Sequence, residues 1–182
     1  MSNTSATGGY LLPLTGGSID GLDLRRAIGA VLVGISGIDG TLVRPSWQQN
    51  PPPIPGIDVN WIAFFIQERR GDSNSYQQVQ DSESSFLSRH EDLDILLSFY
   101  GVDCLQIAAN VREGFELTQN NEIMLTNGLA FVRMGAITHI PELINDRYFD
   151  RADSVLTLRH EITKNYSILS FEKEQVTIIN SK

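Results

Sequence analysis

The segment from residue 88 to residue 115 changes its hydrophobic period at a single glycine, Gly101. Before Gly101, apolar and polar residues alternate, as is typical of a half-buried strand. The apolar side of this alternation consists of Leu93, Ile95, Leu97 and Phe99. After Gly101 the apolar residues have helical spacing, at Cys104, Ile107, Ala108, Val111 and Phe115. The pattern predicts a long strand that leads directly into an amphipathic helix, with Asp103 as the N-cap.

Similar patterns along the chain predict the remaining elements. A helix is expected from Asp20 or Ser18, either of which can cap it, to about residue 35, with Gly37 ending it. Strands are expected at 59–67, 129–137 and 154–162, and a strand or strand pair at 168–179. A short extended piece is expected at 42–47, a hairpin or mobile loop at 68–85, an irregular stretch at 118–127, and a short helix or turn at 141–149. The strand at 59–67 is apolar on both faces, so we expect it to be central and covered by helices. This order predicts an α+β fold: a mixed, mainly antiparallel sheet with helices packed on one face.

Composition separates the beginning of the chain from the rest. Residues 1–17 are rich in Gly, Ser and Thr and are expected to form a flexible N-terminal arm. The arm is either a disordered tail or a strap that orders on a neighbouring subunit through Tyr10, Leu11 and Leu12. Residues 18–182 are expected to form one α+β domain, with a proline-rich connector at 48–55 in polyproline II conformation. We expect no signal peptide and no transmembrane segment.

Charge and reactive residues restrict the function. The formal net charge is -8, which disfavours a protein that wraps nucleic acid, because such proteins need clustered Lys and Arg. Cys104 is the one cysteine, so no intrachain disulfide can form, and its place on the apolar stripe predicts a buried thiol. The sequence contains neither a phosphate loop nor a nucleophile elbow. We therefore expect no enzyme activity and no cofactor.

The histidines leave one catalytic alternative open. Two His-Glu dipeptides, at His90 and His160, fall on expected strands and could converge if these strands were neighbours. Adjacent strand residues point to opposite faces, however, so we expect no metal site. A small metal-dependent hydrolase that uses His90, His160 and nearby carboxylates remains an alternative function. Another is a soluble adaptor that binds a partner through Pro51–Pro55.

Arginine and aromatic residues supply the candidate interface. Arg147, Arg151 and Arg159, with Tyr148 and Phe149, form a dense basic and aromatic group, and such residues dominate interface hot spots. The same group could instead form a packed turn with ion pairs to Asp146, Asp150 and Asp153. The full set of candidate subunit or partner contacts is Tyr10, Leu11, Leu12, Arg69, Arg70, Arg147, Tyr148, Phe149 and Arg151.

Several short runs resemble those of the phage neck terminator proteins, which are similar to the tail terminators of tailed phages. The runs are Asn60-Trp61-Ile62-Ala63-Phe64, Arg89-His90-Glu91 with Ser98-Phe99-Tyr100-Gly101, Gly114 with Gln119-Asn120, and Ile140-Pro141-Glu142-Leu143 with Arg147 and Arg151. The order and spacing of these runs carry the resemblance, which extends over about residues 43–178. Residues 1 to about 40 lie outside it.

The resemblance implies a structural subunit that assembles with itself into a ring, typically a hexamer, in the neck of the virion. Such a ring terminates the tail tube and joins it to the connector or collar protein on the head side, with the tube, or tube and sheath, on the tail side. Genome DNA would pass through the lumen without specific binding, and a negative charge suits such passage. The resemblance further implies no catalysis, no cofactor, no metal and no membrane contact, and synthesis in the host cytoplasm.

Overall fold

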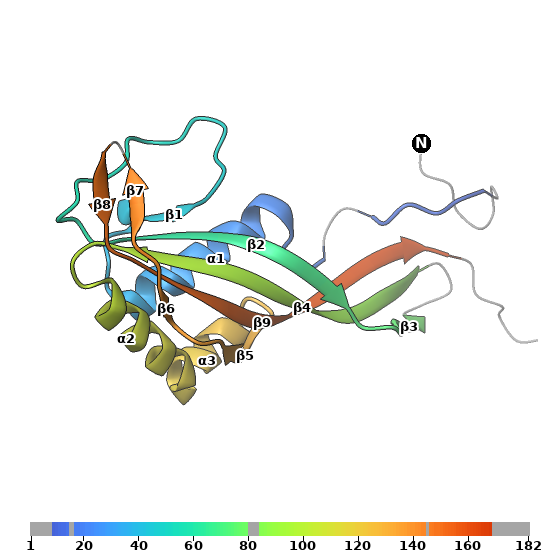
Figure 1. Ribbon diagram of the computed structural model, residues 1–182. Helices are drawn as coiled ribbons and strands as arrows, with labels where there is room; N and C mark the ends of the chain where they lie inside the picture. The colour runs from blue at the N-terminus through green and yellow to red at the C-terminus, as the bar shows by residue number, and fades with distance from the viewer. Residues whose placement is uncertain (1–8, 15–16, 80–83, 145, 169–182) are drawn as a thin grey trace, which may run out of the picture. The chain divides into compact units, whose positions relative to one another are not determined.

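The computed structural model describes residues 9–14, 17–79, 84–144 and 146–168. The helices are α1 (Gly21–Ser36), α2 (Cys104–Glu116) and α3 (Thr118–Leu125), with a 3-10 turn η1 (Gly40–Leu42). The strands are β1 (Val43–Pro45), β2 (Trp61–Gly71), β3 (Tyr76–Val79), β4 (Ser84–Tyr100), β5 (Leu129–Met134), β6 (Thr138–His139), β7 (Glu142–Ile144), β8 (Arg147–Phe149) and β9 (Arg151–Ser167). The predicted α+β fold with a mixed, mainly antiparallel sheet is confirmed (Figure 1).

The chain forms two compact units. The helical unit consists of residues 19–72 and 90–161, and the arm unit of residues 1–18, 73–89 and 162–182. The long strands β4 and β9 contribute residues to both units.

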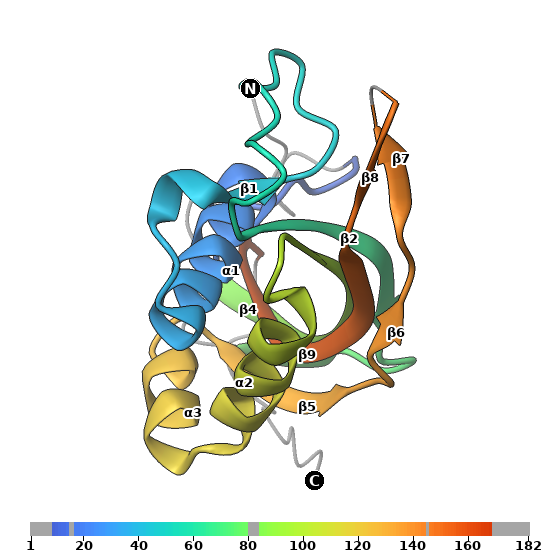
Figure 2. The ribbon, with the colours of Figure 1, turned by 60° about the vertical axis from the view of Figure 1, so that its left-hand side comes forward.

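The helical unit is a sheet with helices on one face. Its strands follow the order β1-β2-β4-β9-β5, with β6 paired to β9, and β1 is parallel to β2. Helices α1, α2 and α3 lie together on one side of this sheet (Figure 2). The core between them includes Leu93, Ile95, Leu97 and Phe99 from β4 and Leu24, Ile28, Leu32, Ala108, Val111 and Phe115 from the helices. The alternation before Gly101 and the apolar stripe after it therefore meet in one core, as their periods predict.

Local chemistry sets the predicted boundaries. The Asp20 carboxylate accepts a hydrogen bond from Gly21 N at the start of α1, and Gly37, with φ of 69°, ends that helix. Gly101 has φ of 106°, a conformation that residues with a Cβ rarely adopt, where β4 turns towards α2. Asp103 occupies the N-cap position of α2, but its side chain makes no capping hydrogen bond. Its carboxylate instead accepts from Asn60 Nδ2 over 2.9 Å, which ties the start of α2 to the start of β2.

Two predicted segments differ in the structure. Residues 118–127 are not irregular but contain α3, because the amides of Asn120 and Asn121 donate to the carbonyl groups of Gly114 and Phe115 and fasten α3 to α2. Within residues 141–149 the turn alternative holds rather than the helix, but as part of a hairpin: β7 pairs with β8, and Asp146, with φ of 61°, lies in the turn between them. Both outcomes depend on contacts that a short window of sequence does not reveal.

The strand expected at 59–67 also differs in part. β2 lies between β1 and β4, as expected for an inner strand, but helices cover only one of its faces. Residues of the 44–54 segment lie over the other face instead. β2 continues through the polar residues to Gly71. For residues 68–85 the hairpin alternative therefore holds where the chain is described, and residues 80–83 lie outside the described residues. Of the strand expected at 168–179, all but residue 168 lies outside the described residues.

In the arm unit, the beginning of the chain pairs with the end of β9. Leu14 N donates to the carbonyl of Asn165 over 2.7 Å, and Ser18 N donates to that of Thr163 over 3.2 Å. Gly17 forms an antiparallel bridge with Lys164. In the same unit β3 pairs with β4 through Tyr76–Val79. The base of the predicted arm is thus hydrogen-bonded to its own chain.

Alanine substitutions at two helical glycines test the packing of α1 against α2. A Cβ at Gly114 would overlap Ile35 Cγ2, whereas a Cβ at Gly34 would meet nothing within 4 Å. We expect Gly114→Ala to lower the free energy of unfolding by about 1–2 kcal/mol, because the overlap outweighs the better helix propensity of alanine. We expect the matched Gly34→Ala to raise it by about 0.5–1 kcal/mol. Urea unfolding followed by tryptophan fluorescence measures both, and equal effects of the two variants would contradict this packing.

Candidate interaction surface

The sheet face opposite the helices changes character along its length. Alternation along β4 directs Asp92, Asp94, Leu96, Ser98 and Tyr100 to this face. The part with the two aspartates is charged, and the part near Tyr100 is aromatic. The two parts are described in turn.

The charged part is a ladder of ion pairs across neighbouring strands. Arg159 donates to Asp92 over 3.0 Å and also pairs with Asp72, while Arg70 pairs with Asp94. The hydrogen bond from Arg70 lowers the pKa of Asp94. The Asp94 carboxylate also accepts a hydrogen bond from Thr157 Oγ1 over 2.7 Å. Exposed pairs of this kind contribute at most about 1 kcal/mol each. The ladder therefore serves the strand register more than the stability of the fold.

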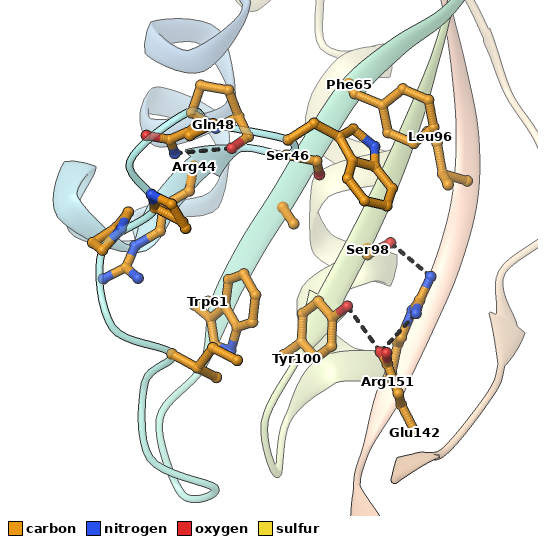
Figure 3. Close-up of a pocket in the computed structure, with 16 residues that line it drawn as sticks. Arg44, Ser46, Gln48, Trp61, Phe65, Leu96, Ser98, Tyr100, Glu142 and Arg151 are labelled. Carbon is orange, nitrogen blue, oxygen red and sulfur yellow. Dashed lines mark hydrogen bonds and ion pairs between the residues drawn. The ribbon is translucent and has the colours of Figure 1, made fainter. Parts of the chain in front are cut away.

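The aromatic part contains a pocket of about 530 Å³ (Figure 3). Trp61 stacks on Tyr100 at one side, with ring centroids 4.1 Å apart and planes 5° from parallel. On the other side Trp47 meets the ring of Phe65 edge-on, with centroids 6.4 Å apart. Pro51 and Pro52, from the predicted connector, also line this pocket. The proline-rich segment thus forms one wall of a hollow over the sheet.

Trp47 is strained and exposed at the rim of this aromatic pocket. Its backbone has φ of 58°, in the left-handed region that bulky residues rarely occupy. Its side chain is 87% exposed. Strained residues cluster at functional sites, and exposed tryptophans are frequent anchors of interfaces. Trp47 is therefore a candidate contact residue that the sequence pattern did not single out.

Arg151 closes the pocket at the Tyr100 end. Its guanidinium donates to Asp153 and Glu142, each over 2.7 Å, and to Ser98 Oγ over 3.3 Å. The hydrogen bonds to Asp153 raise the pKa of Arg151 further above its usual value. Burial raises the pKa of Tyr100 to about 12, so its hydroxyl stays protonated and donates to Glu142 over 3.0 Å. Arg151 is thus paired within the chain, with Asp153, one of the aspartates expected to pair with this group, and also with Glu142.

Arg69 belongs to a network on the helix side of the sheet in which Glu91 and His160 are buried and Arg69 and Asp20 are partly exposed. It pairs with Asp20 over 2.9 Å and with Glu91, which also contacts His160 Nδ1 over 3.1 Å. Burial raises the pKa of Glu91, but the hydrogen bonds to Arg69 and His160 outweigh it, and the net direction is downward. His90 is exposed and lies one residue from Glu91, on the other face. The structure therefore brings Glu91 and His160 together but not His90, and no group of three or more metal-ligand side chains occurs among the described residues.

The remaining candidates divide between the two units. In the β8 strand, Arg147 and Tyr148 are exposed, Tyr148 at 71%, whereas Phe149 is buried. In the arm unit, Tyr10 is 94% exposed and Leu12 62%, with Leu11 half-buried. Arg70 lies in the ion-pair ladder described above. The candidates therefore form no single patch within the helical unit.

Sequence reasoning missed the aromatic pocket, although a signal was present. The two tryptophans of the chain, Trp47 and Trp61, flank the proline-rich segment on either side. A stiff segment between two large aromatic residues can lie over the strand that follows it and leave a hollow beneath. Tyr100 comes from a distant strand, and only the fold places it beside Trp61.

Comparisons with known proteins identify one family. A family model described as phage neck terminator protein matches residues 22–182. No curated protein matches the sequence. Among the described residues, no helix is long and apolar enough to span a membrane.

Variants of Arg151 and Arg147 compare an arginine that is paired within the fold with one that is exposed. We expect Arg151→Ala to lower the free energy of unfolding by about 2–4 kcal/mol, because it leaves the largely buried Asp153 without its partner. We expect the matched Arg147→Ala to change it by no more than about 0.5 kcal/mol, since that side chain is exposed. Chemical unfolding of both variants at neutral pH measures the difference, and a neutral Arg151→Ala would contradict the assigned role.

Glu91 gives the stability a defined pH dependence. Its pKa is lower in the folded protein than its ordinary value of 4.5, so its contribution is complete above that value and is lost as the pH falls through the folded pKa. We therefore expect the difference in unfolding free energy between the wild type and Glu91→Gln to be largest near neutral pH and to shrink below about pH 4.5. Unfolding curves between pH 3 and 7 test this; a difference that grows on acidification would contradict it.

Proposed function

The chain belongs to the phage neck terminator family and has a structural role in the phage tail and neck, and from this premise we propose that its copies close into a ring that terminates the tail tube. In this proposal the ring joins the tube to the connector or collar protein on the head side. The tube, or tube and sheath, is the partner on the tail side. The number of subunits that we propose is six.

The exposed apolar residues support self-assembly. Several large side chains are about half exposed or more in the helical unit: Trp47, Leu105, Leu117, Ile123, Leu125, Leu143 and Tyr148. They lie on separate elements, on helices as well as on the hairpin. A ring needs two different patches on each subunit, because every contact is heterologous. Distributed patches suit this arrangement better than a single self-complementary patch does.

The charge of the chain supports passage of DNA through the lumen. The formal net charge is -8, and Arg69, Arg70 and Arg159 are each paired with a carboxylate of β4. Arginines paired in this way offer few cations to replace the counterions of DNA. We propose that genome DNA passes the ring without specific binding, in a protein of the virion that is synthesised in the host cytoplasm.

The organisation of the subunit follows from this proposal. We propose residues 1–17 as an arm that contacts neighbours and residues 18–182 as the ring-forming domain, with the connector at 48–55 inside it. The role is structural, and we propose no reaction, cofactor or metal for it. The pairing of Glu91 with Arg69 and His160 supports a structural use of this carboxylate.

Native mass spectrometry of the full-length protein tests the proposed ring. We expect one closed species of six chains, each of 20.2 kDa, to dominate as the concentration rises. Electron microscopy of virions with a tag on this chain should place the label at the neck. A chain that stays monomeric at every concentration and is absent from the particles would contradict the proposal.

A further inference from the structure

We propose that the aromatic pocket of one copy receives residues 10–14 of a neighbouring copy, an inference that rests on the proposed ring. The pocket is formed wholly by the helical unit, and its aromatic walls are Trp47, Trp61, Phe65 and Tyr100. Aromatic grooves of this kind are the usual receptors for extended, proline-containing segments. The segment Tyr10-Leu11-Leu12-Pro13-Leu14 has this composition.

The polar groups of the pocket favour an uncharged occupant. Arg151 is paired with Glu142 and Asp153, so it needs no acid from outside. Arg44 donates to the backbone carbonyl groups of Thr41 and Pro53, over 2.7 and 2.8 Å. A charged ligand would have to break these contacts or be desolvated without a partner. The pocket therefore selects for an apolar segment.

The first residues of the chain match this requirement. Residues 1–17 contain no Asp, Glu, Lys or Arg in a chain of net charge -8. Within this stretch Tyr10, Leu12 and Leu14 are 94%, 62% and 42% exposed. Pro13 fixes its own φ and disfavours helix at Leu12, so the segment is kept extended before it binds. This lowers the entropy that binding costs.

The way the arm is attached to its own chain favours insertion of its exposed residues into a neighbouring copy. Its base is held by the hydrogen bonds of Leu14 and Ser18 to the end of β9, while the side chains of Tyr10 and Leu12 remain exposed. A donor segment and an acceptor pocket on different parts of one chain make a heterologous contact, which closes into a ring when the rotation allows. A five-residue segment buries too little surface for a stable complex by itself. Repeated around a ring, each contact becomes intramolecular and gains from the high effective concentration.

The tryptophans of the chain report directly on this contact. Both of them, Trp47 and Trp61, line the pocket, so their emission follows its occupancy without an added label. The donor variant is Tyr10→Ser/Leu12→Ser/Leu14→Ser in the full-length chain. The matched control is Leu22→Ser, at an exposed leucine of α1 that belongs neither to residues 10–14 nor to the lining of the pocket. Emission excited at 295 nm and the mass of the species are measured together over a range of concentrations.

We expect the wild type and Leu22→Ser to show a blue shift as they assemble. In the donor variant we expect no such shift, and a concentration for half-assembly at least tenfold higher. A synthetic peptide of residues 9–15, added to the donor variant, should restore the shift in a saturable way. The peptide with serine at positions 10, 12 and 14 should have no effect.

Three outcomes would overturn the inference. The first is a donor variant whose emission and assembly equal those of the wild type. This result would refute the proposed arm contact but would not contradict the proposed ring. The second is a peptide that leaves the emission unchanged. The third is a wild-type shift that persists unchanged at dilutions where the protein is monomeric, because the arm would then occupy the pocket of its own chain. Failure of the wild type to assemble at all would instead count against the proposed ring.

Discussion

The burial of one face of the sheet beneath three helices is the constraint on which the helical unit depends. Leu93, Ile95, Leu97 and Phe99 of β4 enter this core from alternate positions, so the residues between them must face the other way. A shift of one residue would place Asp92 and Asp94 in the core, so the register is fixed. The opposite face is then left to ion pairs and aromatic side chains, and of the candidate contacts it carries Arg70, Arg151 and Trp47. Assembly, rather than a reactive centre, is the function that this division favours.

Sequence reasoning correctly predicted the features that depend on residues close together in the chain. Asp20 and Gly37 mark the ends of α1 through their own side-chain and backbone chemistry, and Gly101 marks the change from strand to helix. It did not predict α3 or the β7–β8 hairpin. Helix α3 depends on Asn120 and Asn121, whose amides bind carbonyl groups of the preceding helix. Such bonds use residues with low helix propensity, which a local pattern counts against a helix.

The candidate contacts were predictable only in part. Residue type alone singled out Arg151 and the exposed Tyr148, because arginine and aromatic residues are frequent in interfaces. An ion pair between residues close in sequence, such as Arg151 with Asp153, was predictable, whereas the pair of Arg159 with Asp92 from another strand was not. Pairs of that second kind depend on which strands are neighbours. The aromatic pocket was hard to predict for the same reason, because it combines five separate segments: residues 44–54 and parts of β2, β4, β7 and β9.

We propose that subunits meet over the sheet face without helices, and that Trp47, at the rim of the aromatic pocket, is buried in this contact. Hydroxyl-radical footprinting, read by mass spectrometry on the isolated chain and on intact particles, tests this claim most directly. The account predicts strong oxidation of Trp47 in the isolated chain, where its side chain is 87% exposed, and marked protection in the particle. Equal oxidation of Trp47 in both states would contradict it.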